Sequence, residues 1–160
     1  MRRTHLPRWF ATFVARPRVS ALALRLATVI DRPLMRWSGG RLRLSFVIPL
    51  VLLRVRGARS GALREVPLLC VPDGDDLIVV ASNGGRPREP AWAHNLRAHR
   101  DVEGLHDGRC RRYRAEELAG SARSDAWMKA TAVYPGYDHY ADRASRPIAV
   151  FRLCAEGEAA

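Results

Sequence analysis

The chain has 160 residues, a length that fits one ordinary domain and is enough to bury a core. Hydrophobic residues make up 48% of it, so the composition excludes a largely disordered protein. No run of about 18 uncharged apolar residues occurs, so the sequence predicts no membrane-spanning helix. The three cysteines are far apart and no histidine stands at ligand spacing from them, which predicts reduced thiols, a cytoplasmic location and no metal site.

The net charge of +11 is unevenly distributed. Residues 1–64 contain 14 arginines and one acidic residue, whereas residues 65–160 contain 13 basic and 15 acidic residues. A basic half favours an anionic partner: nucleic acid, an anionic lipid surface or a phosphorylated ligand. We predict no nucleic-acid partner, because the chain lacks helix-turn-helix spacing and a basic platform with interleaved aromatic residues.

Residues 5–37 have the pattern of two helices separated by Pro17. Each has one apolar face, and arginines are interspersed. A helix of this kind packs on its own domain or a second subunit, or lies on an anionic membrane surface. We therefore predict a basic helical extension over residues 1–37 and a separate domain over residues 38–160. Peripheral contact with the inner face of the plasma membrane and a homodimer both stay open at this point.

From Ser38 onward the sequence changes to short strands and turns. Strands are predicted at residues 46–56, 65–71, 77–81, 102–105, 109–114 and 148–153, and helices at 90–99 and 115–131, with a loose tail at 155–160. Six short strands with few helices predict a small antiparallel barrel. A Rossmann fold is excluded because neither GxGxxG nor alternating strands and helices occur, and a P-loop and a GxSxG elbow are also missing.

Two glycine-containing segments are candidates for ligand binding. The turn at residues 57–64 exposes backbone N–H groups beside Arg59 and Arg64, which suits phosphate or carboxylate groups. The loop at residues 81–85 follows a strand, and its two glycines let the backbone approach a flat or phosphorylated ligand. Each segment alone is also compatible with an ordinary solvated turn or a flexible loop.

Two aromatic segments follow. On the helix at residues 90–99, Trp92, Asn95 and Leu96 share a face. The two apolar residues are expected in the core, and a buried Asn95 would need a hydrogen-bond partner, for which a ligand is one option. Residues 134–140 contain three tyrosines around a Pro-Gly turn. Their rings and hydroxyl groups suit an aromatic acceptor near a flavin-like ring, or they form a separate aromatic cluster.

Taken together and in order, these segments resemble the deazaflavin-dependent nitroreductase family, a branch of the FMN-binding split-barrel group. The residues that match the family pattern are Gly57, Arg59-Ser60-Gly61, Arg64, Pro67-Leu68, Asp73-Gly74, Val80-Ala81-Ser82, Gly84-Gly85, Pro90, Trp92, Asn95-Leu96, Tyr134-Pro135-Gly136-Tyr137 and Tyr140. The resemblance covers residues 38–153. It implies an α+β protein, mainly antiparallel β, with a six-stranded split β-barrel, flanking helices and the N-terminal helical extension.

The resemblance also implies coenzyme F420 as cofactor, with FMN as the alternative. The activity implied is hydride transfer from reduced deazaflavin to a small-molecule acceptor such as a quinone or nitroaromatic. The alternatives are an FMN-binding reductase and a non-catalytic, membrane-associated F420-binding protein.

The site residues implied by the resemblance fall into four groups. Arg59, Ser60 and Arg64 would hold the phosphate and oligoglutamate tail. The deazaflavin and ribityl portion would be lined by Val66, Pro67, Leu68, Ala81, Ser82, Asn83, Gly84 and Gly85. Pro90, Trp92 and Asn95 would support the same groove. The catalytic residues facing the acceptor would be Ser82, Tyr134, Tyr137 and Tyr140.

Two positions depart from the family pattern. Ala58 and Asn83 stand where relatives often have Arg and Lys. Both differences remove a cation from the expected groove, and Arg56, Arg86 and Arg88 are the nearby cations available to compensate.

Overall fold

The computed structural model describes residues 49–158. The predicted helices within residues 5–37, the boundary at residue 38 and the first residues of the strand predicted at 46–56 lie outside the described residues. Within residues 49–158, no helix combines the length and the apolar character needed to cross a bilayer.

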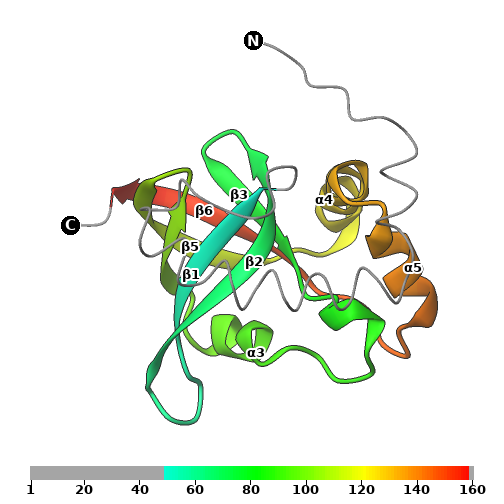
Figure 1. Cartoon of the computed structure of the whole chain (residues 1–160), viewed down its shortest axis with the longest axis horizontal. Helices are drawn as coiled ribbons and strands as arrows, with labels where there is room; N and C mark the ends of the chain where they lie inside the picture. Colours follow the sequence, from blue (N-terminus) through cyan, green and yellow to red (C-terminus); the bar gives the residue numbers. More distant parts are fainter. Residues whose placement is uncertain (1–48, 159–160) are drawn as a thin grey trace.

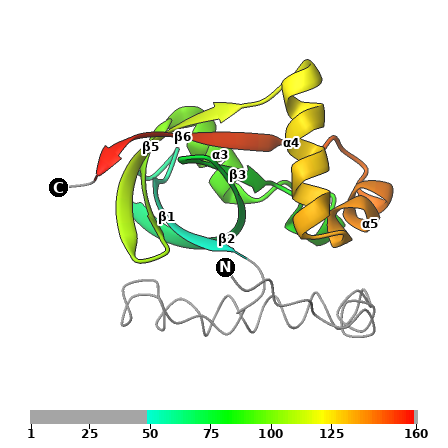
Figure 2. The same ribbon diagram turned by 90° about the horizontal axis from the view of Figure 1, so that it is seen from above.

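Six antiparallel strands form a closed barrel in the order β1-β2-β3-β6-β5-β4 (Figures 1 and 2). Their bounds are β1 Leu50–Arg56, β2 Leu63–Asp73, β3 Asp76–Val80, β4 Asp101–His106, β5 Arg109–Glu117 and β6 Val150–Glu158. Hairpins join β1 to β2, β2 to β3 and β4 to β5, so most pairing is between neighbours in sequence. The predicted six-stranded, mainly antiparallel fold is confirmed.

The barrel interior is filled by side chains that alternate along the strands. Val51 and Leu53 of β1 point inward with Tyr113 of β5 and Phe151 of β6, and all four are buried. At Gly104 of β4, an added Cβ would lie 3.0–3.1 Å from the side chains of Tyr113, Leu53 and Val51. The neighbouring side chains therefore already occupy the space in which a residue larger than glycine would sit.

Helices cover the outside of this barrel. The short helix η1 (Asn83–Gly85) and α3 (Ala91–Ala98) follow β3, and α3 packs beside β1 and β5. The helices α4 (Gly120–Val133) and α5 (Gly136–Arg143) lie together at the opposite side of the molecule from the end of β6 (Figure 2). They bury a second apolar cluster against β2, β3 and β6. The helix predicted at 90–99 is confirmed as α3.

The helix predicted at 115–131 is wrong at its beginning. Residues 115–117 continue β5, because Ala115 faces the core and the ladder with β6 runs on through Glu117↔Phe151. Strand pairing outweighs the helix preference of the two glutamates. The helix begins instead at Gly120, whose φ is +55°. The loose tail is wrong for residues 155–158, which pair with β5 as far as Arg111↔Glu158.

The Pro-Gly turn between the tyrosines leads directly into α5, a helix that the sequence pattern does not predict. Pro135 precedes the helix, and Gly136 is its first residue. A Cβ at Gly136 would lie 2.5 Å from the ring of Tyr134, so glycine allows the chain to fold back over that ring. Proline and glycine therefore make a compact link between α4 and α5 rather than a loop.

Candidate functional site

The predicted cofactor-binding segments lie where β2 and β3 separate. The two strands pair from Cys70↔Val79 to Asp73↔Asp76, and among the described residues Leu63–Leu69 pair only with β1. Val66–Leu68 belong to this part of β2, which does not pair with β3, and Ala81–Gly85 continue from β3 on the other side of the opening. The strand register therefore places both segments at one split in the barrel wall.

On the β2 side of the split, two of the three side chains pack against the core. Val66 and Leu68 are half-buried and pack against the barrel interior, whereas Pro67 lies between them on the opposite face. Proline has no N–H to donate to a further strand, which agrees with an edge position. This segment thus offers a ligand its backbone edge and Pro67 more than the side chains of Val66 and Leu68.

The loop on the other side has a left-handed backbone. The φ angles of Asn83, Gly84 and Gly85 are 48°, 66° and 74°. A Cβ at Gly85 would lie 3.0 Å from the carbonyl oxygen of Tyr140 and 3.2 Å from its Cα, so the loop packs closely on the backbone of α5. A Cβ at Gly84 would meet no atom within 4 Å. The two glycines therefore have different roles: Gly85 allows the close packing, and Gly84 borders open space.

Ser82 begins this loop and is almost entirely buried, with 8% of its surface exposed. Apart from tyrosines, it is the one buried polar residue within residues 49–158. Its hydroxyl group makes no hydrogen bond to the described part of the chain, and it does not cap η1. The Ser82 side-chain oxygen is not one of the fully enclosed atoms without a partner in residues 49–158, so it retains some accessible surface and can bond a ligand.

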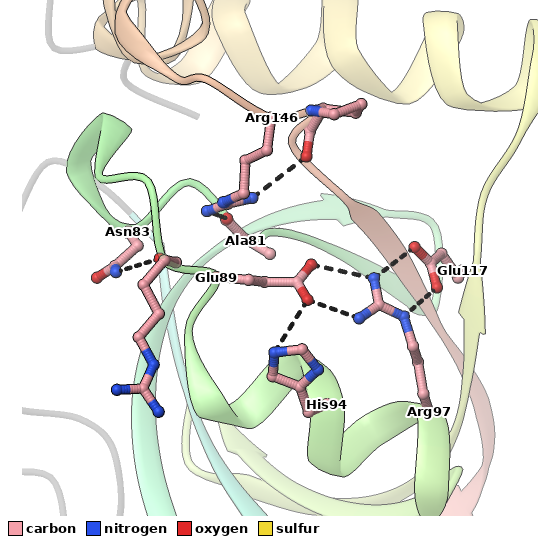
Figure 3. Close-up of polar contacts among 9 residues, drawn as sticks. Ala81, Asn83, Glu89, His94, Arg97, Glu117 and Arg146 are labelled. Carbon is pink, nitrogen blue, oxygen red and sulfur yellow. Dashed lines mark hydrogen bonds and ion pairs between the residues drawn. The ribbon is translucent and has the colours of Figure 1, made fainter.

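Two arginines that the sequence motifs did not single out hold the carbonyl groups of this loop. Arg146 donates to the carbonyl oxygen of Ala81 at 2.9 Å (Figure 3), and Arg143 donates to that of Gly84 at 3.2 Å. Both follow the tyrosine segment in the chain, so they link it to the loop. Their sequence signal is hidden because arginine is frequent throughout the chain, and nothing in the pattern separates a structural arginine from a solvated one.

A third arginine anchors the chain between the loop and α3. Arg97 is bound by both oxygens of Glu89, at 2.6 and 3.0 Å, and by both oxygens of Glu117, at 2.6 and 2.8 Å (Figure 3). Its guanidinium group lies 5.6 Å from the ring centroid of Phe151, and His94 Nε2 lies 3.3 Å from Glu89. The hydrogen bonds from Arg97 lower the pKa of Glu89 and Glu117 and keep both carboxylates charged.

The three tyrosines form a buried cluster between α4, α5 and the barrel. The ring centroids of Tyr134 and Tyr137 are 5.2 Å apart, and the hydroxyl groups of Tyr134 and Tyr140 hydrogen-bond at 3.0 Å. Burial raises the pKa of Tyr137, so its hydroxyl stays protonated. Because the Tyr140 backbone contacts Gly85, the cluster lies against the loop. The structure thus shows the aromatic cluster, and the catalytic role of the tyrosines stays a prediction.

The arginine turn is held by α3. The side-chain oxygen of Asn95 accepts a hydrogen bond from the N–H of Ala58 at 3.0 Å. The partner that Asn95 needs is therefore the turn itself, and its support of a cofactor is indirect. Arg59, Ser60 and Arg64 are exposed, and neither arginine forms an ion pair within residues 49–158.

The contacts of the remaining predicted residues are with the chain itself or with solvent. Trp92 is buried and packs edge-on against Phe151, with 5.8 Å between the ring centroids. Pro90 precedes the first residue of α3 in an extended conformation. Of the compensating cations, Arg56 donates to the carbonyl oxygen of Gly61 in the turn at 2.9 Å, and the side chains of Arg86 and Arg88 are exposed.

The turn and the loop are both beside α3 but not in contact with each other. The loop precedes the first residue of α3, and the turn binds Asn95 farther along it; in Figure 1 they lie at opposite ends of the side that α3 covers. A concavity of about 560 Å³ lies beside the turn, lined by Arg56, Leu63 and Arg100 among others. It includes no residue of the loop. A single ligand touching both segments must therefore be elongated, since eight helical residues span about 12 Å.

A small filled barrel with its candidate ligand segments on the outside places this chain in the split-barrel class. The family model for F420H(2)-dependent quinone reductase matches residues 24–154, and the chain belongs to that family. This finding confirms the resemblance to deazaflavin-dependent enzymes.

Individual relatives agree. An F420H(2)-dependent quinone reductase of Mycobacterium tuberculosis is 43% identical over 70 residues, 42% of this chain and 47% of the relative, so the chain spans about half the length of the curated relatives it matches. A solved F420-H2 dependent reductase, FDR-A, is 36% identical with a TM-score of 0.62, covering 66% of this chain and 93% of that chain. Another solved chain, described as a domain-swapped dimer, is 33% identical with a TM-score of 0.65 and coverage of 78% and 92%.

Proposed function

We propose that this protein is an F420H2-dependent reductase that transfers a hydride to a small organic acceptor, with a quinone as the preferred class. The observation that carries the proposal is Ser82, an almost entirely buried residue at the split of the barrel whose hydroxyl group forms no hydrogen bond within residues 49–158. In a chain of the F420H(2)-dependent quinone reductase family, such a group is suited to the cofactor or the acceptor.

The residues present fit an elongated, anionic cofactor. Gly84 leaves open space beside the loop backbone, where a flat ring system can approach. Arg59 and Arg64 are exposed cations whose charge is not neutralised by an ion pair within the described chain, and they suit a phosphate or carboxylate tail. Since α3 separates the two places, a molecule with a ring at one end and charges at the other matches the arrangement.

When bound, reduced F420 would supply the hydride. The residues of the chain would orient the cofactor and the acceptor and supply a hydrogen-bond donor to the acceptor. The backbone of residues 82–85 would hold the ring system, since Gly84 borders open space. The Ser82 hydroxyl donates a hydrogen bond to the acceptor oxygen that gains negative charge. The packed helices α4 and α5 bury the tyrosine cluster, and burial raises the pKa of Tyr137, which keeps its hydroxyl group protonated.

The test is a fluorescence titration of the purified protein with reduced F420, followed by turnover of the quinone menadione. Ser82→Ala should keep cofactor affinity and lower kcat, whereas Arg59→Ala and Arg64→Ala should weaken binding and reduce its salt dependence. Failure of the wild-type protein to bind at roughly tens of micromolar, together with no turnover, would refute the proposal. A purified protein with a bound yellow flavin would instead indicate FMN.

The basic charge of residues 1–37 supports a second proposal, peripheral contact with an anionic membrane. Co-sedimentation with anionic liposomes should be stronger for the whole chain than for a chain that begins at Ser38, and equal partitioning would refute it. We also propose a homodimer, supported by the solved relative described as a domain-swapped dimer. Light scattering of the purified protein would measure the mass of the assembly, and a monomer mass at all concentrations would refute the homodimer.

A further inference from the structure

We propose that Arg97 is a positioning residue for the cofactor-binding loop and acts on it through Glu89. The inference rests on the proposed function only in taking residues 82–85 as the place where the cofactor ring binds. Neither glutamate partner of Arg97 belongs to the predicted site, and Arg97 itself touches no predicted site residue through its guanidinium group.

The segment that needs positioning is residues 86–90, which connects η1 to α3 without helix or strand. Within it, the side chain of Glu89 is only 14% exposed and points back toward α3 (Figure 3). A largely enclosed carboxylate needs a matching cation, and Arg97 supplies two parallel hydrogen bonds to it. The path of the segment is thereby fixed at one defined point, four residues after Gly85.

Arg97 can serve as a fixed point because it is itself held from two other directions. Glu117, the last residue of β5, binds the other edge of the guanidinium group. Phe151 of β6 lies under its plane. The arginine therefore connects the segment to the barrel wall and not only to its own helix. This geometry uses the planar five-donor group of arginine, which lysine cannot reproduce.

The two ends of the segment at residues 81–89 are held by different arginines. The carbonyl groups of Ala81 and Gly84 are held by Arg146 and Arg143, and the far end is held at Glu89 by Arg97. Between them, the Asn83 side chain donates to the Arg88 carbonyl at 2.7 Å, so a shift at the far end is transmitted to the left-handed part of the loop. Loss of the Glu89 contact should therefore move the residues on which the cofactor ring rests.

The two glutamates provide a matched pair of variants, since each contributes one carboxylate to the same guanidinium group. Glu89→Gln removes the negative charge and replaces one of the two accepting oxygens at the loop segment by an NH2 donor, and Glu117→Gln does the same at the barrel wall. We expect both to lower the unfolding midpoint. Only Glu89→Gln should weaken reduced F420 binding, by roughly tenfold or more, because small displacements of a binding group have large effects. Arg97→Lys should behave like Glu89→Gln, although it keeps the charge.

A second readout does not depend on the cofactor. Amide hydrogen exchange at residues 82–85 in the ligand-free protein should become faster in Glu89→Gln and stay as in the wild type in Glu117→Gln. If the wild-type protein binds no F420, the proposed function fails, and the exchange comparison alone decides the positioning role. Equal effects of the two variants on binding or on exchange would show a merely structural role and would overturn the inference.

Discussion

Replacing Gly85 by alanine tests whether the loop is fixed by its packing on α5. The new methyl group would lie 3.0 Å from the carbonyl oxygen and 3.2 Å from the Cα of Tyr140. Both are backbone atoms of a helix, so they cannot rotate away as a side chain would. The substitution also places alanine at a φ of +74°. Gly84→Ala is the matched control, because it has a similar φ of +66° but no atom within 4 Å of the new carbon.

The expected magnitudes follow from these two terms. A left-handed backbone costs a non-glycine residue about 1–2 kcal/mol, and this cost applies to both variants. Crowding against atoms that cannot move adds about 1–3 kcal/mol at Gly85 alone. For a chain of 160 residues each kcal/mol corresponds to roughly 2–4 °C in Tm, so Gly85→Ala should melt at least about 2 °C below Gly84→Ala.

The assay is urea unfolding of both variants followed by circular dichroism, with Tm as a second measurement. Gly85→Ala should also weaken binding of reduced F420 under conditions in which the variant is fully folded, because a shifted loop changes the surface that contacts the ring. Equal free energies of unfolding for the two variants would refute the reasoning, since the two glycines differ chiefly in how closely they approach Tyr140.

Single contacts elsewhere in the molecule can be tested in the same way. Asn95→Leu removes the acceptor that holds the arginine turn and should cost about 1 kcal/mol of stability, and it should weaken F420 binding more than binding of a deazaflavin without the phosphate tail. A double-mutant cycle with Tyr134→Phe and Tyr140→Phe should give a coupling of about 0.5–1.5 kcal/mol in urea unfolding, whereas additive effects would mean that the 3.0 Å hydroxyl contact is not formed. Arg97 holds the pKa of Glu89 below its ordinary 4.5, so the contribution of this pair to the free energy of unfolding should be complete above that pH and decline as the pH falls below it. Arg97→Met should reduce this pH dependence in acid unfolding curves.

The barrel could be predicted because its strands alternate and are joined by glycine-containing turns. The same local signals failed where tertiary pairing decides the outcome. The glutamates at 116 and 117 favour a helix by propensity, yet they continue β5 because β6 offers a partner strand. Gly136 has the sequence context of a simple turn, and the close approach of the Tyr134 ring that requires a glycine there is seen only in the folded chain.

The candidate site was predictable as a set of segments but not as a geometry. The register of β2 and β3 brings residues 66–68 and 81–85 to one split, which sequence order alone does not reveal. A ligand was one option for the partner of Asn95, and the structure shows the N–H of Ala58 in that place, because long-range backbone contacts leave no local pattern. For the same reason the anchoring roles of Arg97, Arg143 and Arg146 could not be recognised among so many arginines.

The packing around Gly104 has a consequence for how enzymes of this shape can diversify. A barrel whose lumen is already filled by side chains cannot admit a ligand, so a ligand must bind on its exterior, at segments such as the turn at residues 57–64. Substitutions at exposed positions of these segments, such as Arg59 and Arg64, can then alter ligand binding while the packed strands keep their core. Stability and ligand choice are thus separable at such exposed positions, but not at Gly85 or in α5, where the outer segments are themselves closely packed.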